Sequence, residues 1–441
     1  MIEKYLVKKI TEPVDWKVTV PGSKSMTNRA LLLAALSAGT VRVEGVLFSD
    51  DSRHFLACLV SLGFAVQIEE EKKCVTVTGC GGRIPSGEAV IDVGSAGTAA
   101  RFLAAMLGFS DGCYEIRCSA QMKRRPMAEL FELLSGVGAK ITFLEEEGHL
   151  PVRITGCRSA RADETAGETP RRLSLDITKS TQFLSALLLI APMVPEGMKI
   201  HITSEKTDGS YIRITRKMMQ EFGVSVAFDG RDYEVPCRSS YRKETYMVEP
   251  DMSAACYFYA AAAVTGGRAL VRHVHMDNTQ GDLRFLEVLE RMGCKADDTP
   301  EGVRVTGPAD GALRGITVNM NDFSDQALTL AAIAPFADAP VRIEGIGHIR
   351  GQECDRIYAI QTNLTALGIR CEEEETAVTI YPGSPHGGNV ETYDDHRVAM
   401  AFSLIGLRTD GIVIENPACC RKTFEDYFTV LSELTGKKTE A

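Results

Sequence analysis

The feature that most constrains the fold of this chain is an internal repeat. Six apolar segments recur at a spacing of roughly 70 to 83 residues, and each opens on small or polar residues. A second, more amphipathic helical pattern follows each of them and ends at a glycine, the residue that most easily takes the positive φ of a helix C-cap. The apolar segments begin near Ser25, Thr98, Thr181, Ser253, Asp325 and His396. The glycines are Gly63, Gly138, Gly223, Gly293, Gly368 and Gly436.

The repeat predicts an α/β fold of six βαβαββ units. Segments such as 254–264 and 328–336 are apolar nearly all round, so their helices must be buried on all sides. The following helices, such as 282–292 and 356–367, carry charge on one face and belong at the surface. Six buried helices are too many for one compact core at this length, so we expect two lobes of three units each.

The lobe boundaries are expected where the repeat is interrupted. The first lobe should span 22–249, and the second should combine 1–21 with 250–441. The polar stretch 158–172 is expected to form an exposed loop inside the first lobe, and 436–441 a frayed tail.

Charge and composition exclude several classes of protein. A net charge of -10 argues against a nucleic-acid partner, although local cations can still bind a small anion. Residues 1–12 mix Glu and Lys, which is not a signal peptide, and the most apolar stretch, 183–194, is too short to span a bilayer. The 13 cysteines are scattered without any Cys-x-x-Cys pair, so we expect a reduced, cytoplasmic protein without a structural zinc. We also expect a monomer that acts without a metal and does not bind membranes.

The starts of the buried helices carry the chemistry. At the first, a Pro21-Gly22 turn leads into a helix whose first turns hold Lys24, Ser25 and Arg29. Helix starts have unpaired N–H groups and a partial positive charge, so two cations and an alcohol there favour a phosphate or carboxylate ligand. The alternative is a capped helix with solvated cations.

Similar groups recur at the other openings. Gly97-Thr98 is followed one turn later by Arg101, three cations precede Pro126, and Ser180-Thr181-Gln182 offers more hydrogen-bonding side chains than capping needs. In the second lobe Asp322 and Asp325 precede a buried helix, where they could be ordinary caps, and Glu353 with Arg356 could be an ordinary ion pair. Their recurrence at one position of the repeat favours a shared site.

Seven of these motifs, in order and spread over nearly the whole chain, resemble those of the 3-phosphoshikimate 1-carboxyvinyltransferase (EPSP synthase) family. They are Pro21-Gly-Ser-Lys-Ser-x-x-Asn-Arg29, Gly97-Thr98-x-x-Arg101, Arg125-Pro126, Ser180-Thr181-Gln182, Gln280-Gly-Asp-x-Arg-Phe285, Asp395-His396-Arg397 and Lys422-Thr423-Phe424. The resemblance implies a two-lobed enolpyruvyltransferase-type fold that closes by hinges near 21 and 250, with the first lobe mainly on the shikimate 3-phosphate side.

The resemblance also implies the reaction and the residues that carry it. The enolpyruvyl group of phosphoenolpyruvate would pass to the 5-hydroxyl of shikimate 3-phosphate, releasing phosphate, with no cofactor and no metal. Shikimate 3-phosphate would contact Lys24, Ser25, Arg29, Ser180, Thr181, Gln182, Tyr211, Asp325, His348 and Gln352. Phosphoenolpyruvate would contact Lys24, Gly97, Thr98, Arg125, Gln182, Arg356, His396, Arg397 and Lys422.

Three residues would be catalytic. Asp325 would accept the proton of the 5-hydroxyl, since neighbouring cations favour its ionised form. Glu353 and Lys24 are the candidates for proton transfer at the methylene carbon. The same cations oppose Glu353 as a proton donor and desolvation favours it, which leaves the choice open.

The chain departs from the family pattern at several positions. Gln352 stands where the family usually has Lys, and His348 where it usually has Asn. Ser95 and Asp208 stand for the usual Asn and Ser. The loss of the Lys removes a positive charge near the shikimate phosphate, and a protonated His348 would replace it.

The sequence leaves two alternatives open. UDP-N-acetylglucosamine enolpyruvyltransferase has the same fold and chemistry but typically Lys-Asn after the first turn and a reactive loop cysteine. This chain has Lys24-Ser25, and Cys118 is a poor match for that cysteine. A non-catalytic homologue that binds anionic metabolites is the other alternative, prompted by Gln352. Gly97 leaves room for glyphosate, which inhibits many members of the family, so some sensitivity is expected.

Overall fold

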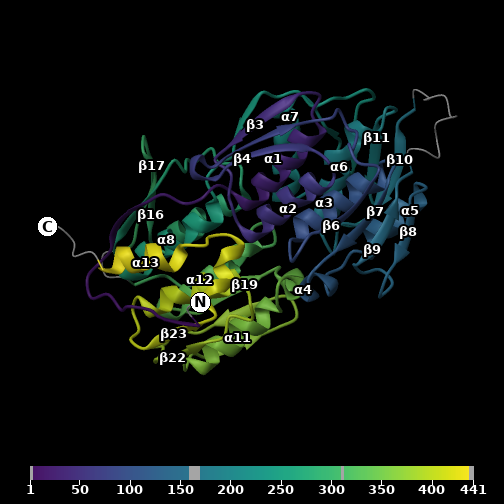
Figure 1. Cartoon of the computed structure of the whole chain (residues 1–441). Coiled ribbons are helices and arrows are strands. Elements are labelled where there is room, and N and C mark those ends of the chain that lie inside the picture. The colour runs from purple at the N-terminus through teal and green to yellow at the C-terminus, as the bar shows by residue number, and fades with distance from the viewer. Residues whose placement is uncertain (1–2, 158–168, 309–311, 437–441) are drawn as a thin grey trace. The chain divides into compact units, whose positions relative to one another are not determined.

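Six buried helices, one in each repeat, form the interior of the chain in a computed structural model that describes residues 3–157, 169–308 and 312–436 (Figure 1). Every residue of the second and the fifth of these helices is buried, which confirms the prediction from their all-round apolarity. The third and fifth end in short 3-10 turns that contain a proline, η3 (Ala191–Met193) and η6 (Ala334–Phe336). The six are α1 (Lys24–Leu36), α3 (Gly97–Gly108), α6 (Thr181–Ile190), α8 (Met252–Thr265), α10 (Ala327–Ile333) and α12 (His396–Gly406).

The amphipathic helices follow as predicted, and the first five end before a glycine with φ between 83 and 104°. The sixth glycine, Gly436, is instead the last residue of its helix, so it is not a C-cap. The fourth helix is shorter than expected, because 281–284 form a 3-10 turn, η4 (Gly281–Arg284). These helices are α2 (Asp50–Ser61), α5 (Ala128–Gly136), α7 (Ser210–Glu221), α9 (Phe285–Arg291), α11 (Arg356–Ala366) and α13 (Tyr427–Gly436), and a short α4 (Ala120–Lys123) precedes α5.

Five of the six sheets have four strands in the same order. The opening strand pairs in parallel with the second, and the remaining pairs are antiparallel. The orders are β14 (Thr245–Met247), β3 (Thr40–Glu44), β5 (Cys74–Thr78), β4 (Ala65–Glu69); β6 (Glu88–Asp92), β7 (Cys113–Arg117), β9 (Val152–Thr155), β8 (Lys140–Phe143); β10 (Arg171–Leu175), β11 (Met198–Ile202), β13 (Asp232–Val235), β12 (Ala227–Phe228); β2 (Asp15–Val18), β15 (Arg268–Arg272), β17 (Gly302–Thr306), β16 (Lys295–Thr299); and β18 (Thr317–Asn319), β19 (Val341–Glu344), β21 (Val378–Ile380), β20 (Cys371–Glu373).

Among the described residues, the sixth sheet has three strands and no closing antiparallel pair. The N-terminal strand β1 (Lys4–Leu6) instead adds antiparallel to β23 (Ile412–Glu415), which pairs in parallel with β22 (Gly388–Val390).

Two opening strands are exchanged between distant parts of the chain. β2 precedes α1 in the sequence but pairs with β15, which follows α8. β14 precedes α8 but pairs with β3, which follows α1. The chain thereby forms two compact units, Gly22–Glu249, called the continuous unit below, and Met1–Pro21 with Pro250–Ala441, called the split unit.

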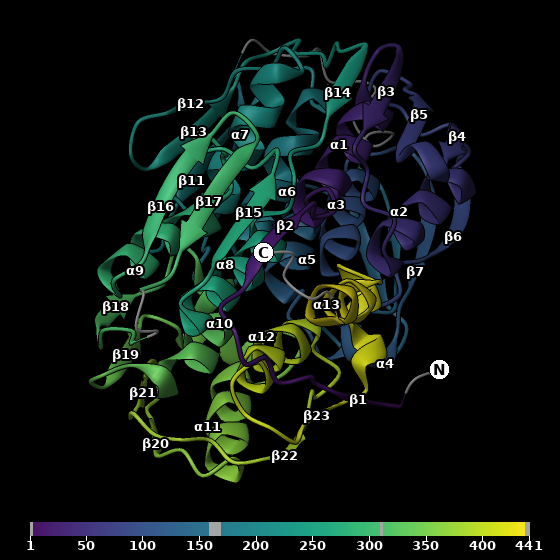
Figure 2. The same cartoon turned by 90° about the vertical axis from the view of Figure 1, so that its left-hand side faces the viewer.

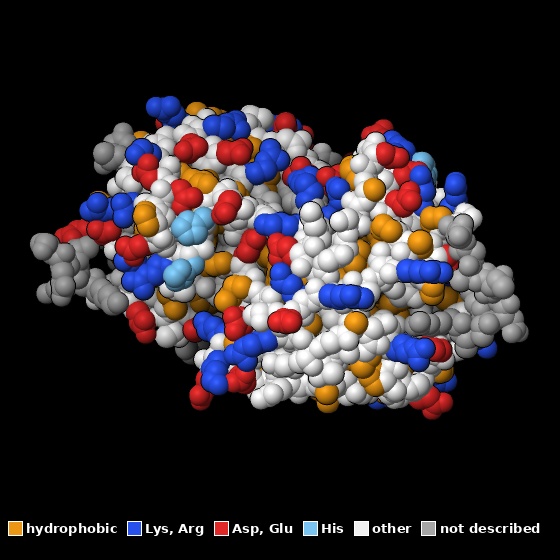
Figure 3. All heavy atoms as spheres, turned by 90° about the horizontal axis from the view of Figure 1, so that it is seen from above, with side chains coloured by type: hydrophobic (Ala, Val, Ile, Leu, Met, Phe, Trp, Pro, Cys, Tyr) orange, Lys and Arg blue, Asp and Glu red, His pale blue; other side chains and the backbone are white. Residues whose placement is uncertain are grey.

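Within each unit the three buried helices pack on one another. In the continuous unit these are α1, α3 and α6, and in the split unit α8, α10 and α12 (Figure 2). Lys and Arg side chains are interspersed with Asp and Glu on the face seen in Figure 3. Among the described residues, no helix has the length and apolarity required to cross a bilayer.

Two of the predicted irregular segments fall partly outside the described residues. Of the expected loop 158–172, residues 158–168 lie outside them, while Arg171 and Arg172 begin β10, so the loop prediction was wrong at that end. Of the expected tail, 437–441 lie outside the described residues and Gly436 is helical. All 13 cysteines are free thiols, as the sequence predicted.

Candidate active site

The first turn of α1 holds a buried ion pair in the continuous unit. Lys24 is the first residue of the helix, and its Nζ lies 2.8 Å from Oδ2 of Asp51. Asp51 is buried in the first turn of α2, where the helix dipole favours a negative charge. The hydroxyl of Ser25 lies 3.5 Å from that of Ser23, the N-cap of α1. The carboxylate therefore fixes the Lys24 ammonium at this helix start.

Arg29, one turn further on, is a buried cation whose hydrogen-bond partners are all neutral. Its Nε donates to Thr215 Oγ1 at 2.8 Å and its Nη1 to the Ser25 carbonyl at 2.9 Å. Its Nη2 donates to the Tyr211 carbonyl at 3.3 Å and to Ser185 Oγ at 3.4 Å. Burial lowers the pKa of Arg29 to about 10. A buried cation that lacks a carboxylate partner is costly unless a ligand supplies the negative charge.

Two further guanidinium groups lie against the start of α3. A Cβ at Gly97 would come within 2.5 Å of Arg125 Nη1 and 2.8 Å of Arg101 Nη1. Arg101 donates to Gln182 Oε1 at 2.7 Å, which ties α3 to α6. Arg125 is 8% exposed, and its side chain has no hydrogen bond or ion pair with any described residue. A side chain at this position would have to displace both guanidinium groups.

The remaining predicted residues of the continuous unit lie at the same helix starts. Thr98, in the first turn of α3, accepts a hydrogen bond from Asn28 Nδ2 of α1 at 2.7 Å. Ser180 is the N-cap of α6 and accepts from the Gln182 amide at 3.2 Å, and Thr181 is the first residue of that helix. Tyr211, in α7, places its ring 5.7 Å from the Arg29 guanidinium. The first turns of α1, α3, α6 and α7 therefore meet.

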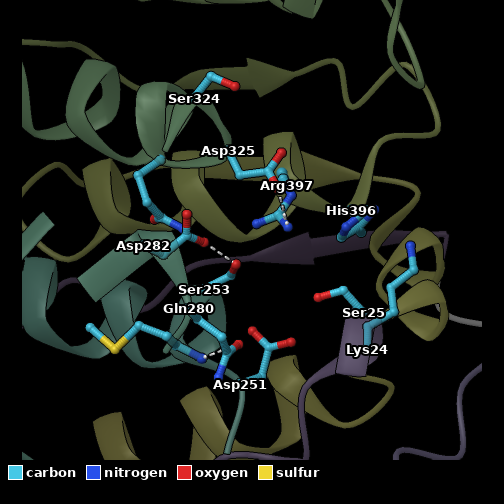
Figure 4. Close-up of polar contacts among 12 residues, drawn as sticks. Lys24, Ser25, Asp251, Ser253, Gln280, Asp282, Ser324, Asp325, His396 and Arg397 are labelled. Atoms are coloured by element: carbon cyan, nitrogen blue, oxygen red, sulfur yellow. Dashed lines mark hydrogen bonds and ion pairs between the residues drawn. The ribbon is translucent and has the colours of Figure 1, made fainter. Parts of the chain in front are cut away.

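In the split unit, Asp325 is held between two arginines. It lies in a single 3-10 turn, η5 (Ser324–Gln326), directly before α10. Its Oδ1 accepts from Arg356 Nη1 at 2.9 Å. Its Oδ2 accepts from Arg397 Nη2 at 3.0 Å (Figure 4). Asp325 is therefore not the helix cap that its position also allowed.

Arg356, the first residue of α11, is the centre of this network. It also donates to Glu353 at 2.9 Å and to Asp395 Oδ2 at 2.8 Å. Burial by itself lowers the pKa of Arg356, but the carboxylates of Asp395, Glu353 and Asp325 outweigh it and raise the pKa well above the usual value. The other oxygen of Glu353 lies 3.2 Å from Nζ of Lys422, in the 3-10 segment η8 (Pro417–Lys422). Carboxylates and cationic side chains therefore alternate along this network, each within hydrogen-bond or ion-pair distance of the next.

The last three predicted residues border the network. His348, in the 3-10 segment η7 (Gly347–Gly351), makes a 2.8 Å hydrogen bond through Nε2 to the hydroxyl of Ser324, which precedes Asp325. His396 is the buried first residue of α12, with Nδ1 3.6 Å from Asp395 Oδ1. Gln352 follows η7, and its side chain makes no polar contact with the described part of the chain.

Sequence reasoning left several members of these clusters out of the site. Asp395 and Arg101 stand in quoted motifs but were assigned no role, although a carboxylate directly before α12 and a guanidinium one turn into α3 were the available signals. Asn28 is one turn from Lys24 on the same helix. Asp51 gave no signal, because its only distinction is that the fold sets it beside Lys24.

Asp282 is another buried carboxylate of the split unit. Burial, together with the charge of Asp325, raises the pKa of Asp282 to about 6, from a usual value of 3.8. The folded protein then takes up a proton more readily than the unfolded chain. This group therefore lowers the free energy of unfolding above pH 6 by about 3 kcal/mol, and the effect vanishes below pH 4.

We accordingly expect Asp282→Asn to gain stability relative to the parent as the pH rises from 4.5 to 7.5, because the variant has no charge to bury. Thermal unfolding across that range measures the difference in Tm. Asp277→Asn, an exposed position in the preceding loop, should show a constant difference. A difference for Asp282→Asn that does not change with pH would contradict the raised pKa.

The comparisons with known proteins agree along the whole chain. The sequence model of EPSP synthase (3-phosphoshikimate 1-carboxyvinyltransferase) matches residues 8–431. The chain is 41% identical over 429 residues to 3-phosphoshikimate 1-carboxyvinyltransferase of Trichormus variabilis, covering 97% of this chain and 98% of that protein. It is 38% identical over 429 residues to the enzyme of that name from Yersinia pestis, covering 96% of each.

Solved structures give the same fold. EPSP synthase from Acinetobacter baumannii superposes with a TM-score of 0.78 at 25% identity, covering 98% of this chain and 97% of that one. The enolpyruvyl transferase NikO from Streptomyces tendae, at 16% identity, shares the fold with a TM-score of 0.72 over 98% and 97% of the two chains. With the family match over residues 8–431 and relatives of about 40% identity over nearly its full length, the chain belongs to the EPSP synthase (3-phosphoshikimate 1-carboxyvinyltransferase) family.

Proposed function

We propose that this protein transfers the enolpyruvyl group of phosphoenolpyruvate to the 5-hydroxyl of shikimate 3-phosphate, giving 5-enolpyruvylshikimate 3-phosphate and phosphate, a step toward chorismate and the aromatic amino acids. The observation that carries the proposal is the family match over residues 8–431, whose motifs supply the clustered side chains of both units. The proposal requires the two clusters to act on one pair of substrates.

The cations of the continuous unit suit the charge of these substrates. Together the substrates bring about four to five negative charges at neutral pH, counting phosphates by their second ionisation. Guanidinium groups grip carboxylate and phosphate through paired hydrogen bonds. We assign Arg29, with Ser25, Ser180, Thr181, Gln182 and Tyr211, to shikimate 3-phosphate. We assign Arg125, with Gly97, Thr98 and the cations of the split unit, to phosphoenolpyruvate.

The reaction needs two proton movements. When the 5-hydroxyl oxygen adds to C2 of phosphoenolpyruvate, the hydroxyl loses its proton and the methylene carbon gains one. Asp325, kept ionised by Arg356 and Arg397, accepts the first proton. Lys24 and Glu353 are assigned to the proton transfer at the methylene carbon. The carbon gains a proton in the addition step and gives one back when phosphate leaves and the double bond reforms. Lys422 stands against Glu353 and can exchange a proton with it.

Phosphate release from the purified protein with both substrates tests the proposal. Release that depends on shikimate 3-phosphate is the expected result. Release with UDP-N-acetylglucosamine instead would favour the related enolpyruvyltransferase. Binding of both substrates without release would indicate a non-catalytic homologue.

Gly97→Ala is expected to raise the KM for phosphoenolpyruvate about tenfold and to leave that for shikimate 3-phosphate within about twofold. The added methyl group displaces the guanidinium groups of Arg125 and Arg101 from their places at 2.5 and 2.8 Å. Steady-state kinetics with each substrate varied measures the effect. Gly39→Ala is the matched control, since a Cβ added at Gly39 would meet no atom within 4 Å outside the neighbouring residues. An unchanged KM in Gly97→Ala would mean that Arg125 does not bind this substrate.

His348→Ala is expected to abolish any rise in shikimate 3-phosphate affinity on going from pH 8 to pH 6. A protonated imidazole would supply the charge that Gln352 lacks, and the bond to Ser324 places it beside the turn of Asp325. Equilibrium binding at several pH values in parent and variant measures this. Equal pH profiles for the two proteins would exclude the role.

The proposal extends to the surroundings of the enzyme. We infer a cytoplasmic monomer that acts on small molecules and not on nucleic acid or membranes, supported by the acidic net charge of -10 and the 13 free thiols. Glyphosate should compete with phosphoenolpyruvate, since Gly97 carries no side chain. An inhibition constant far above the KM for phosphoenolpyruvate would contradict this.

A further inference from the structure

One of the quoted motifs, Gln280-Gly281-Asp282, has no part in the proposed substrate contacts. Gln280 Nε2 donates to the Pro250 carbonyl at 2.7 Å, and its Oε1 accepts from the Met252 amide at 3.2 Å. The motif therefore binds the start of α8. Its third residue, Asp282, accepts a short hydrogen bond from the hydroxyl of Ser253 (Figure 4).

The same carboxylate oxygen of Asp282 reaches the turn that carries Asp325. It accepts from Nε2 of Gln326 at 2.9 Å, and Gln326 directly follows Asp325 in η5. The other end of the Gln326 amide, Oε1, accepts from Thr329 Oγ1 at 2.9 Å. Gln326 is completely buried, and the nitrogen and the oxygen of its side-chain amide both have hydrogen-bond partners, so the side chain is fixed.

The turn itself has little of its own to fix it. η5 is a three-residue 3-10 turn, a conformation with poorer hydrogen-bond geometry than an α-helix. The place of the Asp325 carboxylate thus depends both on the two arginines that bind it and on what holds the turn from the side. On the side of α8 and η4, the turn is held by the side chain of Gln326, which donates a hydrogen bond to Asp282.

The negative charge of Asp282 also affects the protonation of Asp325. Asp282 is 6% exposed and is faced by Asp325 of η5, Arg397 of α12 and the thiol of Cys256 in α8. A second carboxylate close by disfavours negative charge on Asp325 and makes it a stronger proton acceptor. Burial, and after it the charge of Asp325, raise the pKa of Asp282 in the free protein.

We propose that Asp282 is a positioning residue of the reaction: through Gln326 it sets the turn that carries Asp325, and its negative charge raises the basicity of that carboxylate. The inference rests on the proposed function, in which Asp325 accepts the proton of the 5-hydroxyl.

Asp282→Asn, Gln326→Met and the double variant, in the full-length protein, test this. Both single variants are expected to lower kcat about 10- to 100-fold, with each KM within about threefold, as for other residues that orient a reacting group. The double variant should lose little more than one single variant, because both changes weaken the same contact: Gln326→Met removes the donor, and Asp282→Asn replaces the charged acceptor by a neutral amide oxygen. Asp277→Asn repeats the chemical change at an exposed site of the preceding loop and should match the parent.

The pH profile separates position from charge. The acid limb of kcat/KM should move to lower pH in Asp282→Asn, which loses the charge, and stay in place in Gln326→Met, which keeps it. A general loss of packing would not move it in one variant alone. Losses that multiply in the double variant, unchanged kcat in both folded single variants, or an acid limb that moves in neither would overturn the inference while an active parent upholds the proposed function. A parent without phosphate release would overturn both.

Discussion

Asp325→Asn is expected to lower kcat about 10³-fold while shikimate 3-phosphate affinity stays within a few-fold of the parent. The amide cannot accept the hydroxyl proton, and it carries no charge for the two arginines that now hold the carboxylate at 2.9 and 3.0 Å. Arg356 keeps Glu353 and Asp395 as partners, so the network around it should persist. Phosphate release measures kcat, and calorimetry with shikimate 3-phosphate alone measures affinity.

Asp322→Asn is the matched control for this variant. It lies three residues earlier, before the same helix, and its carboxylate is 3.6 Å from Arg284. It should keep the parent kcat. If Asp325→Asn retained more than a tenth of the parent kcat, another group would have to be the base.

Arg125→Gln is expected to raise the KM for phosphoenolpyruvate about 100-fold. Two charge-assisted hydrogen bonds to a carboxylate or phosphate are together worth about 3 kcal/mol, which corresponds to that factor. The free protein should become no less stable, because the change removes a buried charge that has no partner among the described residues. Loss of affinity without loss of stability distinguishes a ligand-binding arginine from a structural one.

Kinetics with phosphoenolpyruvate varied and thermal unfolding of the free protein measure the two effects. Arg124→Gln, the exposed neighbour, should change neither. A fall in Tm of several degrees for Arg125→Gln with an unchanged KM would assign Arg125 to the fold instead.

Local patterns predicted much of the fold, since helix burial and C-caps depend on residues close together in the sequence. All-round apolarity identified α8 and α10, and glycine identified the ends of five amphipathic helices. The exchange of β2 and β14 between distant sheets is not encoded in this way. A strand's own residues fix which face is buried, but not which of several equivalent parallel neighbours it joins.

For the candidate site, too, the sequence predicted the local features and the tertiary structure decided the contacts between distant residues. The sequence by itself determined which helix starts carry cations, carboxylates and glycines, because those residues stand in short motifs at one position of a repeat. Only the tertiary structure decided the pairings: Lys24 with Asp51, Arg101 with Gln182, Arg356 with Asp325, and Asp282 with Gln326. Partners 27 to 81 residues apart meet because the starts of buried helices and of amphipathic helices lie together within each unit, and burial then gives each pairing its strength. That is why Asp51 carried no signal in the sequence and Arg125 a weak one, while the fold makes both conspicuous.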